Sequence, residues 1–300
     1  MRVAFTVSCP AKVNLTLRVV GRRRDGYHEL DTIFQAIDLR DEIEIRPSDS
    51  LSLACDDPGL ATDDSNLVMR AARLLAERCG ISRPTGALTL RKAIPAEAGL
   101  GGGSSDAAGS LLLCSRFWGI APKVGLLDGL GAELGADVPF FLHGGTARGR
   151  GRGDRIEALP FAGPLRVLLG CPPFGISTRT VFSRLGERLT LPGNGVNFPL
   201  VPAHKWPEEN DFGFLANDLE GVVFEDWPEL KRFRDGLREQ GARAALLSGS
   251  GSTVYGIFTR DEQIERAAGR LRGQFSGWRL LATRAVDEGV CLAAPRGESG

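Results

Sequence analysis

The glycine-rich segment over residues 95–108, Pro-Ala-Glu-Ala-Gly-Leu-Gly-Gly-Gly-Ser-Ser-Asp-Ala-Ala, most limits what this chain can fold into. Because glycine lacks a Cβ atom, such a backbone can turn sharply and bring its N–H groups against a ligand. An alternating stretch over 88–91 precedes it, and an apolar, helix-like stretch over 107–117 follows it. The order of strand, glycine loop and helix predicts an anion-binding turn rather than a flexible surface loop. The glycines of the loop are Gly99, Gly101, Gly102 and Gly103.

Three known glycine-rich phosphate loops do not fit this segment. A Walker A loop needs a lysine after its second glycine, and the sequence has none between Lys92 and Lys123. The dinucleotide fingerprint and the protein-kinase glycine loop both fail because Ser104 stands where their third glycine falls. We expect Ser104, Ser105 or Asp106 to cap the following helix, whose free N–H groups and positive dipole end suit a polyphosphate.

The composition is that of an ordinary globular protein with no bias toward a charged partner. The chain has 300 residues, of which 42% are hydrophobic and 25% charged, and its formal net charge is +0. This length suits one large or two medium domains. The zero net charge leaves no overall field to attract nucleic acid or a membrane surface.

Cysteine usage and the N-terminal sequence both favour a cytoplasmic protein. The six cysteines lack C-x-x-C spacing, which fits reduced thiols better than disulfides or zinc, and three histidines leave little for a His-based metal site. Lys12 and Asn14 interrupt the early apolar run, so we expect no signal peptide. No apolar stretch approaches the roughly 18 residues that span a bilayer.

Hydrophobic periodicity predicts strands alternating with helices along the whole chain. A half-buried strand over 13–19 projects Lys12, Asn14 and Thr16 from one face. Further strands are expected at 42–46, 51–55, 88–91, 166–170, 244–247, 253–258 and 278–282, and helices at 66–79, 107–117, 122–134, 178–185, 228–240 and 261–271.

A domain boundary is expected near residue 160, after a stretch rich in Gly and Arg. It divides the chain into a first domain, 1–160, and a second domain, 161–293, followed by a disordered tail, 294–300. Strands alternating with helices, together with hairpin-like pairs, predict an α+β second domain. The stretch 192–209 is rich in Pro and Asn and is expected to form a loop.

Asp137 and Lys12 are the candidate acid–base and cationic residues. Asp137 lies in the run Gly-Ala-Asp-Val-Pro-Phe-Phe, where it can act as a helix N-cap or accept the proton of a hydroxyl substrate beside a cation. Lys12 is the natural cation, because the chain has only five lysines among its 37 lysines and arginines. The alternative for Lys12 is an ordinary lysine at a strand edge.

Two further segments have both a structural and a binding interpretation. Ser248-Gly-Ser-Gly251, between two predicted strands, can be a glycine-rich hairpin or can line a phosphate or substrate pocket. Tyr27 and His28 follow an Asp-Gly turn and can hold a planar ring by stacking and hydrogen bonding. The alternative for this pair is a half-buried aromatic beside a hydrogen-bonded histidine.

Three of these segments together resemble the motifs of the GHMP kinases, a superfamily that includes galactokinase, homoserine kinase and mevalonate kinase. They are the glycine loop 95–108, the opening Pro10-Ala-Lys-Val-Asn14 and Ser248-Gly-Ser-Gly251. The resemblance implies a two-domain α+β fold. Its N-terminal domain is a β/α domain of the kind found in ribosomal proteins, and its C-terminal domain is ferredoxin-like. It also implies ATP-dependent phosphorylation of a free hydroxyl with Mg²⁺.

Gly26-Tyr27-His28 is the most specific part of the resemblance, because generic GHMP kinases lack it. It is similar to members of the non-mevalonate isoprenoid pathway that phosphorylate the 2-hydroxyl of a methylerythritol bearing a cytidine diphosphate. The expected partner is therefore that small molecule rather than nucleic acid or a membrane, and the protein is expected to be a monomer or homodimer. Glu97 departs from the small residue usual in the family, and its carboxylate would repel a polyphosphate unless it points away.

The resemblance also implies roles for individual residues. Asp137 would be the catalytic base, Lys12 would polarise the attacked hydroxyl, and Mg²⁺ would bridge the phosphates without a dedicated carboxylate cage. Tyr27 and Phe182 would sandwich the cytosine, and His28 would hydrogen-bond its edge. The implied ATP-binding residues are Asn66, Pro95, Gly99, Leu100, Gly101, Gly102, Gly103, Ser104 and Ser105. The implied substrate-binding residues are Asn14, Tyr27, His28, Thr178, Phe182, Ser248 and Gly249.

Three other functions stay open at the level of sequence. A homoserine or mevalonate type of kinase would share the motifs, but its acceptor has no nucleobase for Tyr27 and His28 to bind. A non-catalytic metabolite sensor on the same fold is disfavoured by the presence of both Lys12 and Asp137. A nucleic-acid-binding module is disfavoured by the zero net charge.

Overall fold

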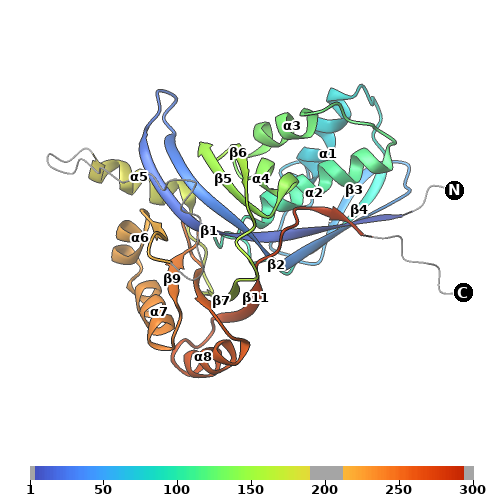
Figure 1. Cartoon of the computed structure of the whole chain (residues 1–300). Coiled ribbons are helices and arrows are strands. Elements are labelled where there is room, and N and C mark those ends of the chain that lie inside the picture. Colours follow the sequence, from blue (N-terminus) through green and yellow to red (C-terminus); the bar gives the residue numbers. More distant parts are fainter. Residues whose placement is uncertain (1–3, 190–211, 294–300) are drawn as a thin grey trace, which may run out of the picture.

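The computed structural model describes residues 4–189 and 212–293, and it consists of two β-sheets with helices packed on each (Figure 1). The first sheet has eight strands and the second has four. The loop expected over 192–209 and the tail expected over 294–300 lie outside the described residues.

A long antiparallel hairpin forms the centre of the first sheet. Its strands are β1 (Phe5–Arg22) and β2 (His28–Arg46), which pair from Phe5 opposite Ile45 to Arg22 opposite His28. The sheet runs in the order β12-β1-β2-β4-β3, with β5 on β2, β6 on β5 and β8 on β1. The remaining strands are β3 (Leu51–Cys55), β4 (Gly86–Arg91), β5 (Thr146–Gly151), β6 (Arg155–Leu159), β8 (Ala216–Asn217) and β12 (Cys291–Leu292).

Strand β1 is buried on both faces, so the expectation of a half-buried strand over 13–19 is wrong. Val13 and Leu15 pack in a core shared with the second sheet, and both are at most 1% exposed. The polar side chains Lys12, Asn14 and Thr16 are buried as well, at 3% exposure or less. Alternation along the sequence separated the two faces correctly, but it could not reveal that the glycine loop and the start of the helix at Val138 cover Lys12 on the polar face.

Four helices cover one face of the first sheet, as the green and cyan part of Figure 1 shows. They are α1 (Leu67–Arg78), α2 (Gly102–Phe117), α3 (Leu126–Leu134) and α4 (Val138–His143). Helix α2 begins at Gly102 after Gly101, which has a φ of 73° and makes no side-chain capping bond. The expected cap from Ser104, Ser105 or Asp106 is therefore wrong, because a left-handed glycine starts the helix earlier.

The second sheet has the order β11-β7-β10-β9, with all neighbours antiparallel. The four strands of this sheet and the two long helices packed on it follow one another in the chain as βαββαβ, and we call the described residues of 166–284 the second half. The predicted ferredoxin-like domain is thereby confirmed. The elements are β7 (Arg166–Cys171), α7 (Pro228–Glu239), β9 (Ala244–Leu247), β10 (Val254–Phe258), α8 (Asp261–Gln274) and β11 (Arg279–Arg284). Two more helices, α5 (Thr178–Leu189) and α6 (Glu220–Asp226), lie in the segment between β7 and α7.

The chain crosses from the first sheet to the second between Leu159 and Arg166, but it returns twice. Strand β8 pairs parallel to β1, and β12 pairs antiparallel to it. Asn217 of β8 donates hydrogen bonds to the carbonyls of Leu247 (2.9 Å), at the end of β9 in the second sheet, and Gly249 (2.7 Å), in the loop after it. These contacts fix the two sheets side by side.

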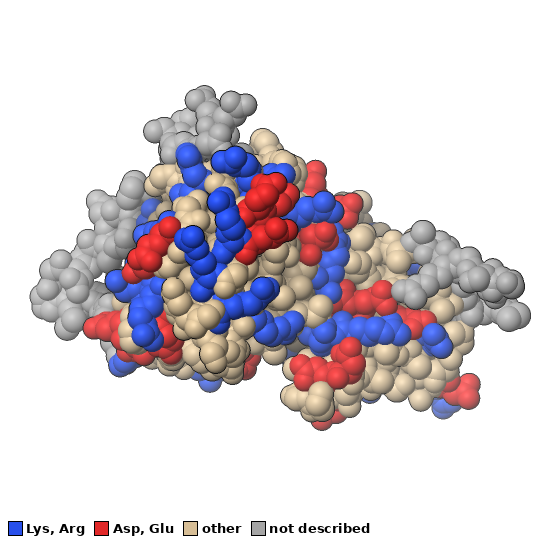
Figure 2. Space-filling view, turned by 90° about the horizontal axis from the view of Figure 1, so that it is seen from below, with Lys and Arg blue, Asp and Glu red and all other residues tan. Residues whose placement is uncertain are grey.

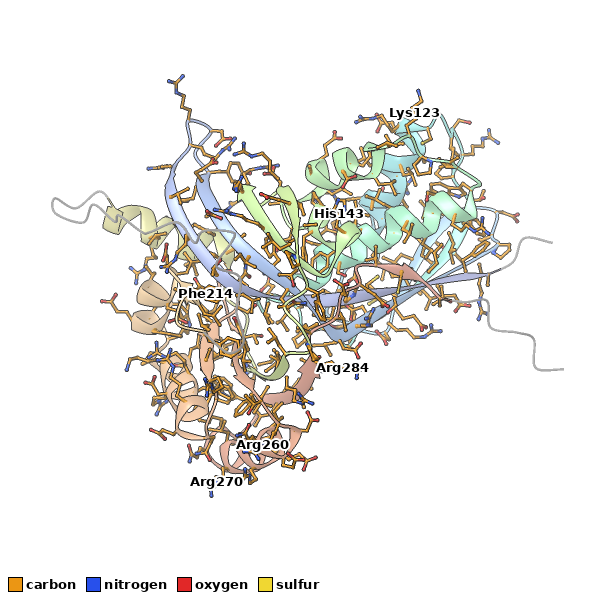
Figure 3. All side chains as sticks on the ribbon, viewed as in Figure 1. Lys123, His143, Phe214, Arg260, Arg270 and Arg284 are labelled. Atoms are coloured by element: carbon orange, nitrogen blue, oxygen red, sulfur yellow. The ribbon has the colours of Figure 1, made fainter. Side chains whose placement is uncertain are left out.

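The distribution of charges, the cysteines and the helices agree with what the composition indicates. On the face seen in Figure 2, basic and acidic side chains are interspersed rather than segregated. Arg260, just before α8, and Arg270, within it, lie at the far end of the second half, well away from the glycine loop (Figure 1 and Figure 3). All six cysteines are free. Among the helices of residues 4–189 and 212–293, none is long and apolar enough to cross a membrane.

Helix α2 lies so close to β1 that only a glycine fits at position 109. A Cβ atom there would lie 2.3 Å from Cys9 Sγ. We predict that Gly109→Ala lowers the free energy of unfolding by about 1–3 kcal/mol through overpacking, measured by urea denaturation. Gly269→Ala, in α8 with open space around it, should instead stabilise by up to about 1 kcal/mol through helix propensity.

A double mutant separates packing from propensity at this contact. Cys9→Ala removes the sulfur that the new methyl group would meet, so Gly109→Ala should cost less in that background than in the native one. Equal costs in the two backgrounds would contradict the close contact as the cause.

Candidate active site

A cavity of about 1660 Å³ lies between the glycine loop, strands β1 and β2, helix α5 and the loop after β9. Pockets for one small ligand are roughly 300–1,000 Å³, so this cavity has room for two. Most of the residues singled out in the sequence line it: Lys12, Asn14, Tyr27, His28, Asn66, Pro95, Gly99, Gly101, Gly102, Gly103, Ser104, Asp137, Thr178, Phe182 and Gly249. Leu100, Ser105 and Ser248 have side chains buried behind the wall, each 0% exposed.

Lys12 is a buried ammonium at the junction of the cavity walls. Its Nζ donates hydrogen bonds to Asn14 Oδ1 (2.7 Å) and the Gly99 carbonyl (3.0 Å), and it lies 3.6 Å from Asp137 Oδ2. Burial lowers the pKa of Lys12, and the neighbouring Asp137 carboxylate opposes that shift. Lys12 is therefore not a solvated lysine at a strand edge.

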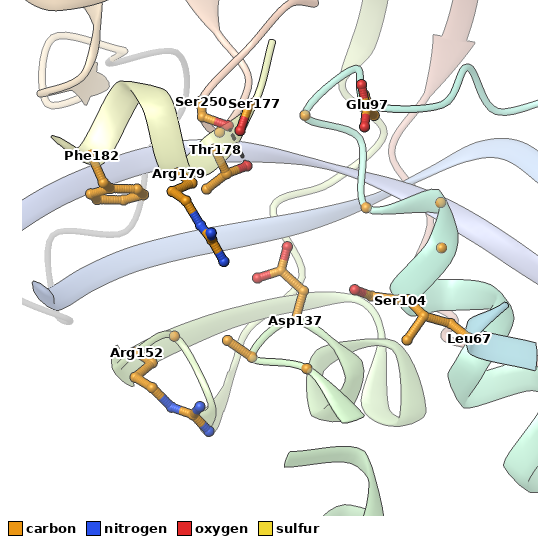
Figure 4. Close-up of a pocket in the computed structure, with 18 of the residues that line it drawn as sticks. Leu67, Glu97, Ser104, Asp137, Arg152, Ser177, Thr178, Arg179, Phe182 and Ser250 are labelled. Carbon is orange, nitrogen blue, oxygen red and sulfur yellow. Dashed lines mark hydrogen bonds between the residues drawn. The ribbon is translucent and has the colours of Figure 1, made fainter. Parts of the chain in front are cut away.

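Asp137 faces the cavity although it stands at the start of a helix. It is the N-cap residue of α4, yet its side chain makes no capping hydrogen bond. Its side chain is 32% exposed, and Figure 4 shows its carboxylate pointing into the cavity. The carboxylate is thus free to meet a ligand beside the Lys12 ammonium, which removes the helix-cap alternative.

At Gly99 the backbone of the glycine loop lies directly against the backbone of the loop after β9. A Cβ atom at Gly99, whose φ is 74°, would lie 2.1 Å from the Ser248 carbonyl oxygen. The Ser248 hydroxyl donates to the Gly99 carbonyl (2.9 Å), which also accepts from Lys12. The Ser248–Gly251 loop thus supports the glycine loop, while Gly249, Ser250 and Gly251 reach the cavity wall.

Tyr27, His28 and Phe182 form an aromatic end of the cavity. The His28 and Phe182 rings lie 5.0 Å apart at an angle of 30°. Tyr27 is 57% exposed, and the Arg152 guanidinium lies 5.5 Å from its ring centre. His28 Nε2 is buried and has no hydrogen-bond partner among the described residues, which is the mark of an atom that awaits a ligand.

Asn14, Asn66 and Thr178 already have partners within the protein. Asn14 Nδ2 donates to Thr32 Oγ1 (2.8 Å), so both ends of its amide are held. Asn66 caps α1 by accepting from the Val68 N–H (2.9 Å) and donates to the Ala61 carbonyl (2.7 Å). The Thr178 and Ser250 hydroxyls are hydrogen-bonded to each other at 2.8 Å.

Two cavity residues that sequence reasoning left without a role are Glu97 and Arg179. Glu97 has a φ of 50°, its backbone carbonyl accepts from the Ile176 N–H (3.3 Å), and its side chain lies beside Gly175. In Figure 4 Glu97 lies away from Asp137, whereas Arg179 points from α5 toward it. No spacing rule distinguishes Arg179 from the many other arginines of the chain.

A buried charge cluster that the sequence did not reveal lies under the start of α2. The Lys92 ammonium binds the carboxylates of both Asp41 and Asp106, the latter at 2.8 Å. Asp106 Oδ1 is buried with no hydrogen-bond partner among the described residues. Burial raises the pKa of Asp106 to about 7, which Asp41 reinforces and Lys92 opposes. Two buried carboxylates thus share one cation at the edge of the cavity.

The cavity offers few protein ligands for a metal ion. Within residues 4–189 and 212–293, no group of three or more His, Cys, Asp and Glu side chains is arranged to hold one. His143, which Figure 3 labels at the end of α4, lies outside the cavity wall and pairs with Asp128 at 2.6 Å.

The first prediction from this geometry concerns the protonation of His28. Burial lowers its pKa, and the positive charge of Arg22 lowers it further. Because removing a nearby cation favours the imidazolium form, Arg22→Gln should raise the pKa of His28. The ring signals of the three histidines in an NMR titration would measure it, and an unmoved His28 pKa would exclude the Arg22 contribution.

The second prediction concerns the pH dependence of stability. An unfolded chain loses the Asp106 proton near the ordinary pKa of 3.8, whereas the folded protein keeps it to about 7. Stability from this group therefore falls as pH rises from about 4 to 7, because the folded state binds more protons there. Melting temperatures of Asp106→Asn relative to the native protein should rise across this window and level off above it. A constant difference would show that Asp106 ionises normally.

Two family models match this chain: "GHMP kinases N terminal domain" over residues 66–145 and "GHMP kinases C terminal" over residues 200–277. A 4-diphosphocytidyl-2-C-methyl-D-erythritol kinase of Pelotomaculum thermopropionicum is 42% identical over 275 residues, covering 90% of this chain and 94% of that protein. One of Chlorobium limicola is 41% identical over 275 residues, covering 91% and 94%.

Solved structures are similar along nearly the whole chain. A crystal structure of 4-(cytidine 5'-diphospho)-2C-methyl-D-erythritol kinase is 37% identical with a TM-score of 0.74, covering 93% of this chain and 98% of that one. Homoserine kinase from Cytophaga hutchinsonii has a TM-score of 0.76 at 18% identity, covering 98% of both chains, which shows a shared fold alone. The length and identity of these matches establish that the chain belongs to the GHMP kinase family.

Proposed function

We propose that this protein transfers the γ-phosphoryl group of ATP to the 2-hydroxyl of 4-diphosphocytidyl-2-C-methyl-D-erythritol. The observation that supports it best is one cavity with Lys12 and Asp137 in its wall and the unpartnered His28 Nε2 beside Phe182 in the same wall. Relatives 37–42% identical over most of the chain bear this kinase name.

At the acceptor end, Asp137 and Lys12 supply the proton chemistry. The Asp137 carboxylate accepts the proton of the attacked hydroxyl, and the Lys12 ammonium stabilises the negative charge that develops on its oxygen. Asn14, held by Lys12 and Thr32, offers a fixed amide beside the same space. These groups are preorganised by protein contacts, so little reorganisation is needed when the hydroxyl arrives.

At the donor end, the glycine loop binds the phosphates of ATP. Its backbone N–H groups and the positive end of α2 suit a polyphosphate. The bare cradle at Gly101 to Gly103 and the Ser104 hydroxyl on the cavity wall fit such a group. Mg²⁺, when bound, neutralises phosphate charge. The donors present fit an ion held mainly by phosphate oxygens and water.

The aromatic end gives the protein its choice of acceptor. A cytosine edge would satisfy His28 Nε2, and Phe182 and Tyr27 offer ring faces for stacking. Acceptors such as homoserine and mevalonate have no nucleobase and would leave this end of the cavity empty. The protein is further proposed to be cytoplasmic and to act as a monomer or homodimer.

Phosphorus NMR with ATP, Mg²⁺ and the proposed acceptor tests the reaction directly. A new phosphomonoester on the tertiary 2-hydroxyl supports the proposal. If the protein phosphorylates homoserine or mevalonate but not the cytidyl acceptor, the proposed activity is wrong and the protein is a GHMP kinase with a different acceptor.

We predict that Asp137→Asn lowers kcat by roughly 10²–10⁴-fold, because the general base is lost. Calorimetric binding of a non-hydrolysable ATP analogue should remain close to that of the native protein. Asp128→Asn, at an exposed carboxylate outside the cavity that pairs with His143, is the matched control and should keep full turnover. Retention of turnover by Asp137→Asn would remove Asp137 from the base role.

A further inference from the structure

The first turn of α5 places a second kind of chemistry on the cavity wall. Thr178, Arg179 and Phe182 all line the cavity, and Arg179 and Phe182, three positions apart, are neighbours on the helix surface. In Figure 4 the Arg179 guanidinium lies between Phe182 and Asp137 and points toward the carboxylate. An arginine therefore stands between the aromatic end and the catalytic end.

Most other cations of the cavity wall are already engaged. Lys12 binds Asn14, the Gly99 carbonyl and Asp137, and Lys92 binds two aspartates. Arg152 binds Asp154 at 2.8 Å, and in Figure 4 it points away from Asp137. By contrast, Arg179 is exposed and forms no ion pair or hydrogen bond with any described residue.

Arg22, on the tip of the β1–β2 hairpin, is the other wall cation that forms no ion pair with a described residue. Its charge acts on His28, so it belongs to the aromatic end. Arg179 differs because it shares a helix with Phe182 and faces Asp137. It is thus the better placed of the two to meet a group that joins a nucleobase to a reacting hydroxyl.

We propose that Arg179 is a specificity-determining residue that binds the diphosphate linking the cytidine to the polyol of the acceptor. The planar guanidinium fork matches phosphate oxygens in pairs, and its charge offsets theirs. This inference rests on the proposed function, since it needs an acceptor with a nucleobase at one end and the hydroxyl at the other. In this arrangement α5 binds the diphosphate between the nucleobase and the polyol.

The other phosphate source in the cavity is ATP, and the geometry disfavours it as the partner of Arg179. Ser104 and the glycine loop approach Asp137 from the side opposite Arg179 (Figure 4). A guanidinium on the α5 side therefore meets the acceptor before it meets the donor.

Calorimetric binding of cytidine and of cytidine diphosphate tests the proposal without any turnover. The native protein should bind the diphosphate more tightly than the nucleoside. Arg179→Gln should weaken cytidine diphosphate binding about tenfold, as expected for a charge-assisted hydrogen bond to phosphate, and leave cytidine binding unchanged. The affinity of Arg179→Lys for cytidine diphosphate should lie between those of the native protein and Arg179→Gln, because lysine keeps the charge but lacks the planar guanidinium fork.

Arg184→Gln is the matched control on the same helix. Arg184 pairs with Asp226 of α6 and lies outside the cavity wall. Its removal takes the same charge from α5 and should leave the preference for the diphosphate intact. A loss as large as that of Arg179→Gln would mean that only the overall charge of α5 matters, and would overturn the proposal.

The remaining outcomes separate this inference from the proposed function. Equal loss of cytidine and cytidine diphosphate binding in Arg179→Gln would indicate a structural role and overturn the inference. Weakened binding of an ATP analogue, with cytidine diphosphate unaffected, would assign Arg179 to the donor instead. If the native protein phosphorylates the cytidyl acceptor and Arg179→Gln keeps its KM, the inference fails while the function stands. If binding prefers cytidine diphosphate over cytidine only when Arg179 is present, but the protein does not phosphorylate the cytidyl acceptor, the inference stands and the proposed function fails.

Discussion

A buried ammonium group is costly unless hydrogen bonds and an opposite charge compensate it, and the partners of Lys12 join the walls of the cavity. Its three partners come from different parts of the chain: Asn14 from β1, the Gly99 carbonyl from the glycine loop, and Asp137 from the start of α4. Breaking a buried pair typically costs about 3–5 kcal/mol. One charge therefore sets the relative positions of a strand, the glycine loop and a carboxylate, and the Gly99 carbonyl also accepts a hydrogen bond from Ser248 of the second half.

The residues with the strongest local chemistry could be predicted from the sequence. A dense glycine run has few uses other than close backbone approach, and a lysine in an apolar strand is costly unless it is paired. Tyr27 and His28 were recognisable because they are adjacent and follow a turn. The strands and long helices of the second half were also predictable from apolar runs and helical spacing, although β7, β9 and β10 are buried on both faces. Their ferredoxin-like arrangement was implied by the resemblance.

What the sequence could not reveal depends on contacts between distant positions. The Lys92 cluster joins residues 51 and 14 positions away from the lysine, and no motif connects them. Burial of the polar face of β1 depends on distant segments, such as the glycine loop that contacts Lys12, and periodicity within β1 does not report them. The start of α2 was misplaced because a left-handed glycine replaced the expected side-chain cap. Arg179 has meaning only beside Phe182 and Asp137 in three dimensions.

The pairing of β12 with β1 has a consequence for how the protein is made. Val7 lies opposite Leu292, so this part of the β1 edge is covered by a strand that is distant from it in the sequence. During synthesis it stays open until residue 292 has left the ribosome, and an open strand edge can pair with another chain. Strand β12 thus protects an edge of the first sheet, although its residues do not line the cavity.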